Sequence, residues 1–264
     1  MKKLVRIVFP EGQDKRILKA ATIIARKKIA IPVIVNGRAK GCQTFYFKGD
    51  EIDYAMNLVK SGIVDGCICG AMHSTLKTIR SALHIIKSKF ASSYFFLPEK
   101  KIFFADCALN INPDSEQLAQ IAEQTAASAK MLGIKPRVAF LSYSTKGSGK
   151  GESVDKVRKA AEIFRKRNKN IAADGELQID AAIVPQVAQL KGSRIIKGDA
   201  NIFIFPNLDA GNIGYKIAQR FGNLKALGPV LQGLKKPVSD LSRGCSVDEI
   251  VEVAKLIARQ AQRK

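Results

Sequence analysis

The densest group of chemically capable side chains lies near the carboxyl end of the chain, in the segment Asp240–Glu249, Asp-Leu-Ser-Arg-Gly-Cys-Ser-Val-Asp-Glu. Ser242 and Arg243 stand directly before a helix that we expect to begin at Ser246. An arginine in this place can hold a phosphate through two parallel N–H bonds. Two interpretations of Glu249 stay open: Ser246-x-x-Glu249 is a capping-box pattern, and a carboxylate there could also serve as a general base.

A second candidate is the polar loop Ser142–Gly151, which follows an expected strand and precedes a basic helix. Backbone N–H groups and a helix N-terminus can hold an anion at such a junction. The loop is not a Walker A motif, because Ser144 stands where that motif needs glycine and Gly151 stands where it needs Ser or Thr. Taken alone, the pattern fits a flexible Gly/Ser loop as well as a phosphate cradle. The candidate anion-binding residues are Ser144, Thr145, Lys146, Gly147 and Ser148.

Three further groups of polar residues have simpler structural interpretations. Asp174 and Glu176 flank a glycine in a segment that we expect to be a strand-to-helix turn, with Asp180 as the N-cap of the helix. His73 precedes a helix that carries Arg80, and a lone histidine is more often a hydrogen-bonded structural residue than a ligand. Five cysteines and two histidines, widely spread, predict neither a disulfide framework nor a metal site.

Strands and helices must position these candidate residues, and both are indicated by short apolar runs that alternate with helical patterns along the chain. Such an alternation predicts an α/β fold in which most strands are parallel and helices flank the sheets. Strands are expected over Val5–Phe9, Pro32–Val35, Thr44–Phe47, Val64–Cys69, a hairpin of Tyr94–Leu97 and Ile102–Phe104, Val138–Leu141 and Ile202–Phe205. Helices are expected after a cap at Asp14, over Ile52–Val59, Thr75–Lys87, Ser115–Leu132, up to about Arg167, over Asp180–Leu190 and Ile213–Phe221, and from Ser246.

Composition narrows the classes of function. The 264 residues are 46% hydrophobic and 25% charged, which excludes a disordered chain. The apolar runs are strand-sized, and the one after the N-terminal lysines is too short for a signal peptide, so we expect a cytoplasmic protein without a membrane partner. The net charge of +21 attracts polyanions, but the chain has no Trp and no arginine-rich tail. A basic surface around a phosphate-handling site is therefore favoured over nucleic-acid binding.

Long motifs in order along nearly the whole chain resemble the phosphate acetyltransferases, within the phosphate acetyl/butyryltransferase family. The resemblance implies a reversible transfer of acetyl between acetyl phosphate and coenzyme A, by attack of the coenzyme A thiolate on the acetyl carbonyl. Coenzyme A and phosphate are then substrates, and neither a cofactor nor a metal is expected. The motifs are Phe9–Asp14, Asp65–Gly66, Gly70–Thr75, Phe104–Ala108, Leu141–Ser148, Asp174–Gln178, Phe205–Ile213, Gly228–Pro229 and Lys236–Cys245.

The resemblance also implies two α/β domains, an active-site cleft between them and a homodimer. The domains would comprise residues 1–90 with 231–264, and residues 91–230. Position by position, Ser242 would orient the reacting groups, Arg243 would bind phosphate, and Arg80 would bind the anionic substrates. Glu249 stands where the family has the aspartate proposed as the base.

The sequence departs from the family pattern at two places. The extra methylene of Glu249 moves its carboxylate by about 1 Å, a displacement that can cost on the order of 100-fold in rate. The stretch between Val35 and Val64 is also shorter than in typical members, and it lacks a helical region that supplies a substrate-binding arginine. Lys40 and Lys48 are candidate replacements. A reduced homologue that acts as a binding or regulatory subunit is the alternative function.

Overall fold

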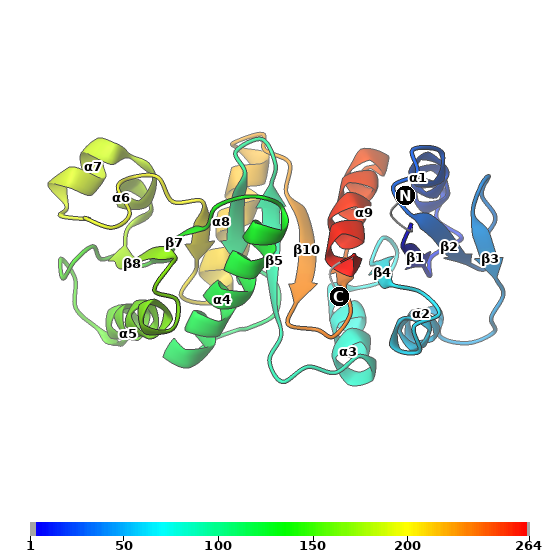
Figure 1. Cartoon of the computed structure of the whole chain (residues 1–264), viewed down its shortest axis with the longest axis horizontal. Coiled ribbons are helices and arrows are strands. Elements are labelled where there is room, and N and C mark those ends of the chain that lie inside the picture. Colours follow the sequence, from blue (N-terminus) through cyan, green and yellow to red (C-terminus); the bar gives the residue numbers. More distant parts are fainter. Residues whose placement is uncertain (1–3, 263–264) are drawn as a thin grey trace. The chain divides into compact units, whose positions relative to one another are not determined.

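A computed structural model describes residues 4–262 of the chain. The chain divides into two compact units, Met1–Ala91 with Leu227–Lys264, and Ser92–Ala226 (Figure 1). The second unit therefore ends four residues before the expected boundary, because strand β10 (Leu227–Gln232) pairs with β11 (Val238–Asp240) in the first unit.

The first unit has the expected α/β architecture, a mostly parallel sheet whose strands alternate with helices along the chain. Its strands lie in the order β3-β2-β1-β4-β11-β10, and the pairs from β3 to β11 are parallel while β10 is antiparallel to β11. Its helix α9, drawn in red, lies beside the blue helix α1 from the opposite end of the chain (Figure 1). The elements not yet bounded are β1 (Arg6–Phe9), α1 (Lys15–Arg26), β2 (Ile31–Val35), β3 (Gln43–Phe45), α2 (Glu51–Lys60), β4 (Gly66–Cys69), α3 (Thr75–Ile85) and α9 (Val247–Ala261).

The strand order of this unit fixes where a ligand can bind. From β1 the chain proceeds to β2 and β3 on one side, and then crosses to β4 on the other side of β1. In open α/β sheets, ligands bind outside the carboxyl ends of the strands at the place where the order reverses. Residues just after β1, β4 and β11 lie at that edge. The predicted cap and buried face of α1 are confirmed: Asp14 Oδ1 accepts the Arg16 N–H at 2.7 Å, and Ile17, Ala21 and Ile24 are buried.

The second unit is also α/β, with the strand order β5-β6-β9-β7-β8. Strands β5 and β6 form the expected antiparallel hairpin, and the other pairs are parallel. Phenylalanine side chains from β5, β6 and β9 pack together in its core. The elements are β5 (Ser92–Leu97), β6 (Ile102–Ala105), α4 (Ser115–Met131), β7 (Arg137–Leu141), α5 (Glu152–Arg167), β8 (Ala172–Leu177), α6 (Ile179–Ile183), α7 (Pro185–Leu190), β9 (Ile202–Ile204) and α8 (Leu208–Arg220).

Three expectations for the second unit were wrong. Asp174 and Glu176 lie within strand β8, not in a turn. The helix expected over Asp180–Leu190 is two helices, because Val184 precedes a proline and is extended. Asp180 is also not an N-cap: it lies inside α6 after Gln178, and its carboxylate pairs with Lys191 Nζ at 2.7 Å. No helix within residues 4–262 has both the length and the apolar character needed to cross a membrane.

Candidate active site

Two buried carboxylates hold the loops at the carboxyl edge of the first unit. Glu11, after β1, accepts the backbone N–H groups of Ala71, Met72 and His73 at 2.8, 2.8 and 3.0 Å. The Nδ1 atom of His73 also lies 3.0 Å from Glu11 Oε1, in agreement with the structural interpretation of this histidine. Glu11 therefore fixes the loop that leads from β4 into α3.

Asp240, the last residue of β11, ties this strand to the start of α3. Its Oδ2 accepts the hydroxyl of Thr75 at 2.6 Å, and the whole residue is buried. Burial raises the pKa of Asp240 to about 6, against the opposing effect of hydroxyl donors from Thr75 and Thr78. Gly70 makes the close approach feasible, because a Cβ there would lie 2.0 Å from Asp240 Oδ1.

The loop after β11 carries Ser242 and Arg243, and both side chains are exposed. The Cys245 N–H donates to the Ser242 carbonyl at 2.9 Å, which closes a tight turn. Within residues 4–262, the guanidinium of Arg243 has no hydrogen-bond or ion-pair partner, and neither does that of Arg80 on α3. Arg80 is exposed and stands about 7.5 Å along the helix axis from Thr75. Two unpaired arginines in one unit can bind anionic groups.

The structure confirms that Glu249 takes part in a capping box at the start of α9. Its N–H donates to Ser246 Oγ at 3.2 Å, and its Oε2 accepts the Ser246 N–H at 2.7 Å. Only Oε2 is used in this cap, and Oε1 has no hydrogen-bond partner within the described part of the chain. A capping carboxylate can therefore keep one oxygen for another proton donor.

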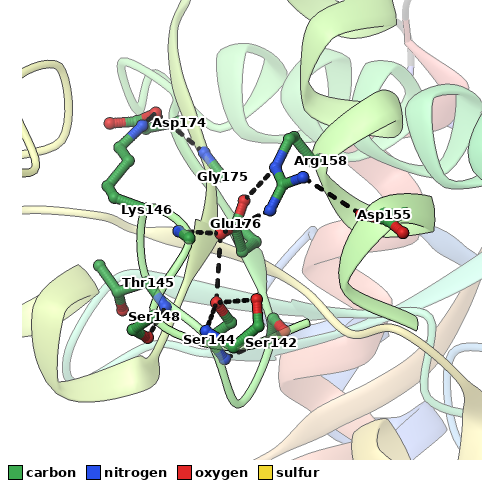
Figure 2. Close-up of polar contacts among 12 residues, drawn as sticks. Ser142, Ser144, Thr145, Lys146, Ser148, Asp155, Arg158, Asp174, Gly175 and Glu176 are labelled. Carbon is green, nitrogen blue, oxygen red and sulfur yellow. Dashed lines mark hydrogen bonds and ion pairs between the residues drawn. The ribbon is translucent and has the colours of Figure 1, made fainter. Parts of the chain in front are cut away.

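The polar loop after β7 is organised around a carboxylate of its own unit (Figure 2). Glu176 Oε1 accepts the Gly147 N–H at 2.7 Å and the Ser144 hydroxyl at 3.2 Å. Arg158 Nε donates to Glu176 Oε2 at 3.0 Å. Burial raises the pKa of Glu176, but the hydrogen bonds from Arg158 and Gly147 outweigh it, so the pKa is lowered. A protein carboxylate thus occupies donors that could hold a phosphate.

The other candidate residues of this loop are bonded within it or to strand β8 and the start of α6. The Lys146 ammonium pairs with the buried Asp174, which also lies 3.3 Å from Arg165 Nη1. Thr145 donates its N–H to Ser148 Oγ at 3.0 Å and accepts the N–H of Gln178 at 2.8 Å. A cavity of about 480 Å³ lies beside the loop, and it is lined by Lys146, Gly147, Arg158, Glu162, Arg165, Gly175 and Glu176.

Sequence reasoning brought together Ser242, Arg243 and Glu249, and the structure places them in one turn and the helix that follows. It gave no role to Glu11, Asp240 or Arg16, which hold the surrounding backbone. The signal for Glu11 was the motif Phe9–Asp14, whose polar residues follow a strand end, whereas Arg16 lies two residues beyond it and had no signal. The loop Ser144–Ser148, which was expected to bind a substrate, lies in the other unit.

Comparison with known proteins identifies relatives over almost the whole chain. The family model described as Phosphate acetyl/butaryl transferase matches residues 1–46 and 42–258. Proteins named phosphate acetyltransferase from Clostridium acetobutylicum and Bacillus subtilis are 48% and 42% identical to this chain, and each match covers 98% of this chain and 95% of the relative. The crystal structure of a phosphotransacetylase from Streptococcus pyogenes superposes with a TM-score of 0.91 at 39% identity, covering 100% of this chain and 96% of that one.

The comparisons also bear on the shortened region. The match to the Clostridium relative extends over 315 positions, whereas this chain has 264 residues, so at least 51 positions of the match have no residue here. The two segments of the family match meet at residues 42–46, between Val35 and Val64. Lys40 and Lys48 are exposed in this short stretch.

Proposed function

We propose that this chain, which belongs to the Phosphate acetyl/butaryl transferase family, catalyses the reversible transfer of an acetyl group between acetyl phosphate and coenzyme A. The observation that carries the proposal is the 48% identity, over 98% of the chain, to a relative named phosphate acetyltransferase. Two unpaired arginines of the first unit, Arg243 in the loop after β11 and Arg80 on α3, supply the charge that phosphate-bearing substrates need.

The proposed reaction assigns one task to each group of the loop. Arg243 binds the phosphoryl group of acetyl phosphate through paired N–H bonds, and Arg80 binds a further anionic group. The Ser242 hydroxyl donates to the acetyl carbonyl oxygen as negative charge develops on it. The sulfur of coenzyme A forms the bond to the carbonyl carbon, and the bond from that carbon to the phosphate oxygen breaks with its electron pair on phosphate.

The thiol proton requires an acceptor, and we assign it to Glu249. Because the cap uses only Oε2, the proton can move to Oε1 while Ser246 stays capped. The arginines neutralise the departing phosphate, so no step of this mechanism passes through a metal or a cofactor; coenzyme A is a substrate. In the loop Ser144–Ser148, we propose that only the exposed groups contact a substrate, since Glu176 and Asp174 hold the others.

The proposal has a direct test. Thioester formation from acetyl phosphate and coenzyme A is followed by ultraviolet absorbance for the wild-type protein and four variants. Arg243→Ala and Glu249→Gln should each lose on the order of 100-fold or more in kcat. Glu249→Asp should remain active, and Arg259→Ala, on the far end of the same helix, is the matched control.

Two results would contradict the proposal, one for the base and one for the reaction. Full activity of Glu249→Gln would restrict Glu249 to capping and remove it as the base. Absence of thioester formation by folded wild-type protein would overturn the proposed function itself.

We further propose that the chain acts in the reducing cytoplasm, which suits its unpaired cysteines.

We also propose that the chain forms a homodimer through α8. Ile213, Ile217 and Phe221 follow one another at four-residue spacing and are 57, 53 and 89% exposed. Residues four apart lie on one side of a helix, so these side chains form an apolar stripe. Such a stripe suits an isologous contact between two copies.

A further inference from the structure

We infer that Arg16 is a positioning residue for the proposed reaction: its guanidinium sets the backbone of the loop that carries Ser242 and Arg243. Arg16 lies in the first turn of α1. Its Nη1 donates to the carbonyl oxygens of Arg243 and Cys245 at 2.6 and 3.1 Å. Its Nη2 donates to the carbonyl of Ala71 at 2.9 Å. One side chain thus joins the loops after β4 and β11 to α1.

Arg16 is itself held by Asp14. Arg16 Nε lies 3.1 Å from Asp14 Oδ1, and Nη2 lies 2.6 Å from Oδ2, a paired contact. The side-chain hydrogen bond to Arg16 lowers the pKa of Asp14 below its ordinary value, so the pair is ionised at neutral pH. A guanidinium has five N–H donors, and these contacts provide five acceptors: three carbonyls and two carboxylate oxygens.

This full use of donors separates Arg16 from a substrate-binding arginine. No N–H of Arg16 is left for a phosphate, whereas Arg243 and Arg80 have no partner within residues 4–262. Lysine has three donors in a different geometry, so it cannot reproduce the five contacts. Arg16 therefore acts on the reaction only through the backbone that it holds.

The contacts of Arg16 also reach Glu249 through one peptide bond. The Cys245–Ser246 peptide is trans, so its C=O and N–H point in opposite directions. The C=O faces Arg16, and the N–H donates to Glu249 Oε2 at 2.7 Å. The same guanidinium sets the peptide after Arg243. Arg16 thus orients the backbone beside two residues of the proposed reaction: Arg243, which would bind the phosphate, and Glu249, which would accept the thiol proton.

The inference is tested with Arg16→Ala and Arg16→Lys, with Arg26→Ala as the matched control. Arg26 is an exposed arginine in the last turn of the same helix, and its side chain contacts none of these loops. We expect kcat for thioester formation to fall on the order of 100-fold in both Arg16 variants, because a displacement of about 1 Å at the reacting groups has that cost. Millimolar guanidinium chloride should restore part of the activity of Arg16→Ala, and the control should match the wild type.

A second measurement is independent of activity. Amide hydrogen exchange of residues 241–249 should become faster in Arg16→Ala and Arg16→Lys, while exchange within α4 stays as in the wild type. Unchanged exchange of the loop, or wild-type kcat in Arg16→Lys, would overturn the inference. A wild-type protein that forms no thioester would overturn the proposed function instead, and the exchange result would still decide whether Arg16 orders this loop. If Arg16→Ala does not fold, Arg16→Lys keeps the charge beside Asp14 and carries both readouts.

Discussion

Replacement of Asp240 by asparagine should make the stability of the protein, relative to the wild type, rise from acid to neutral pH. The Asp240 carboxylate is completely buried, and within residues 4–262 no cation pairs with it. Burial raises its pKa from 3.8 to about 6. Between these two values the folded protein binds a proton that the unfolded chain does not. The contribution to stability is therefore fully present below pH 3.8 and is lost as the pH rises through 6.

The expected size follows from the shift. About two pKa units, at about 1.4 kcal/mol each, correspond to about 3 kcal/mol. Asparagine has the same shape and keeps an oxygen that can accept the Thr75 hydroxyl, so Asp240→Asn introduces no cavity. Its amide NH2 takes the place of Oδ1, which is buried without a hydrogen-bond partner, and this cost is the same at every pH. The free energy of unfolding of the variant, relative to the wild type, should rise by about 2.5 kcal/mol between pH 4 and pH 8.

Urea unfolding of both proteins, followed by circular dichroism at several pH values from 4 to 8, measures this difference. Taking the difference at each pH removes the titration of every other group. A relative stability that is constant over this range, within about 0.5 kcal/mol, would show that burial of Asp240 does not penalise its charge, and the argument from burial would fail.

Three further expectations follow from other contacts. Ser246→Ala should lower the free energy of unfolding by about 1 kcal/mol through loss of the cap, measured by urea unfolding. Glu176→Gln should cost about 1–2 kcal/mol at pH 7, because Gly147 and Ser144 then donate to a neutral acceptor. Since the folded pKa of Glu176 is lowered, its contribution is present above its unfolded pKa and is lost as the pH falls through the folded value, so the variant and the wild type should converge in acid. Ile217→Asp should convert the proposed dimer to a monomer in light scattering, and a wild-type protein that is already monomeric would contradict the α8 interface.

Features encoded by neighbouring residues could be predicted from the sequence. Strands β1, β2, β3 and β4 of the first unit are short apolar runs, and the α1 cap and the Ser246–Glu249 capping box each lie within four residues. Strands β10 and β11 were not predicted, because β10 contains Gly228 and Pro229, a pair typical of turns, and β11 has only three residues. Strand β8 was missed because Asp174 and Glu176 are charged residues around a glycine, a composition that is rare in strands. Their burial depends on Lys146 and Arg158, which local patterns do not connect to them.

The same limit applies to the backbone supports of the candidate site. Arg16 and the Arg243 carbonyl are separated by 227 positions, and Glu11 and the His73 N–H by 62. Glu11 and Arg16 have unremarkable local patterns: the motif Phe9–Asp14 includes Glu11, and nothing in the sequence singled out Arg16. Contacts of this kind follow from the strand order, which brings the ends of β1, β4 and β11 to one edge.

The chain has a net charge of +21, and the positions of its carboxylates determine which basic side chains are left to bind a substrate. In the second unit, Glu176 and Asp174 pair with the basic side chains beside the polar loop. In the first unit, the buried carboxylates of Glu11 and Asp240 instead accept backbone N–H and hydroxyl donors. Within residues 4–262, Arg243 in the loop after β11 and Arg80 on α3 keep their charge free of internal partners. A phosphate attracted by the overall field would therefore meet the unneutralised guanidinium of Arg243 directly after Ser242, which is where the proposed reaction needs it.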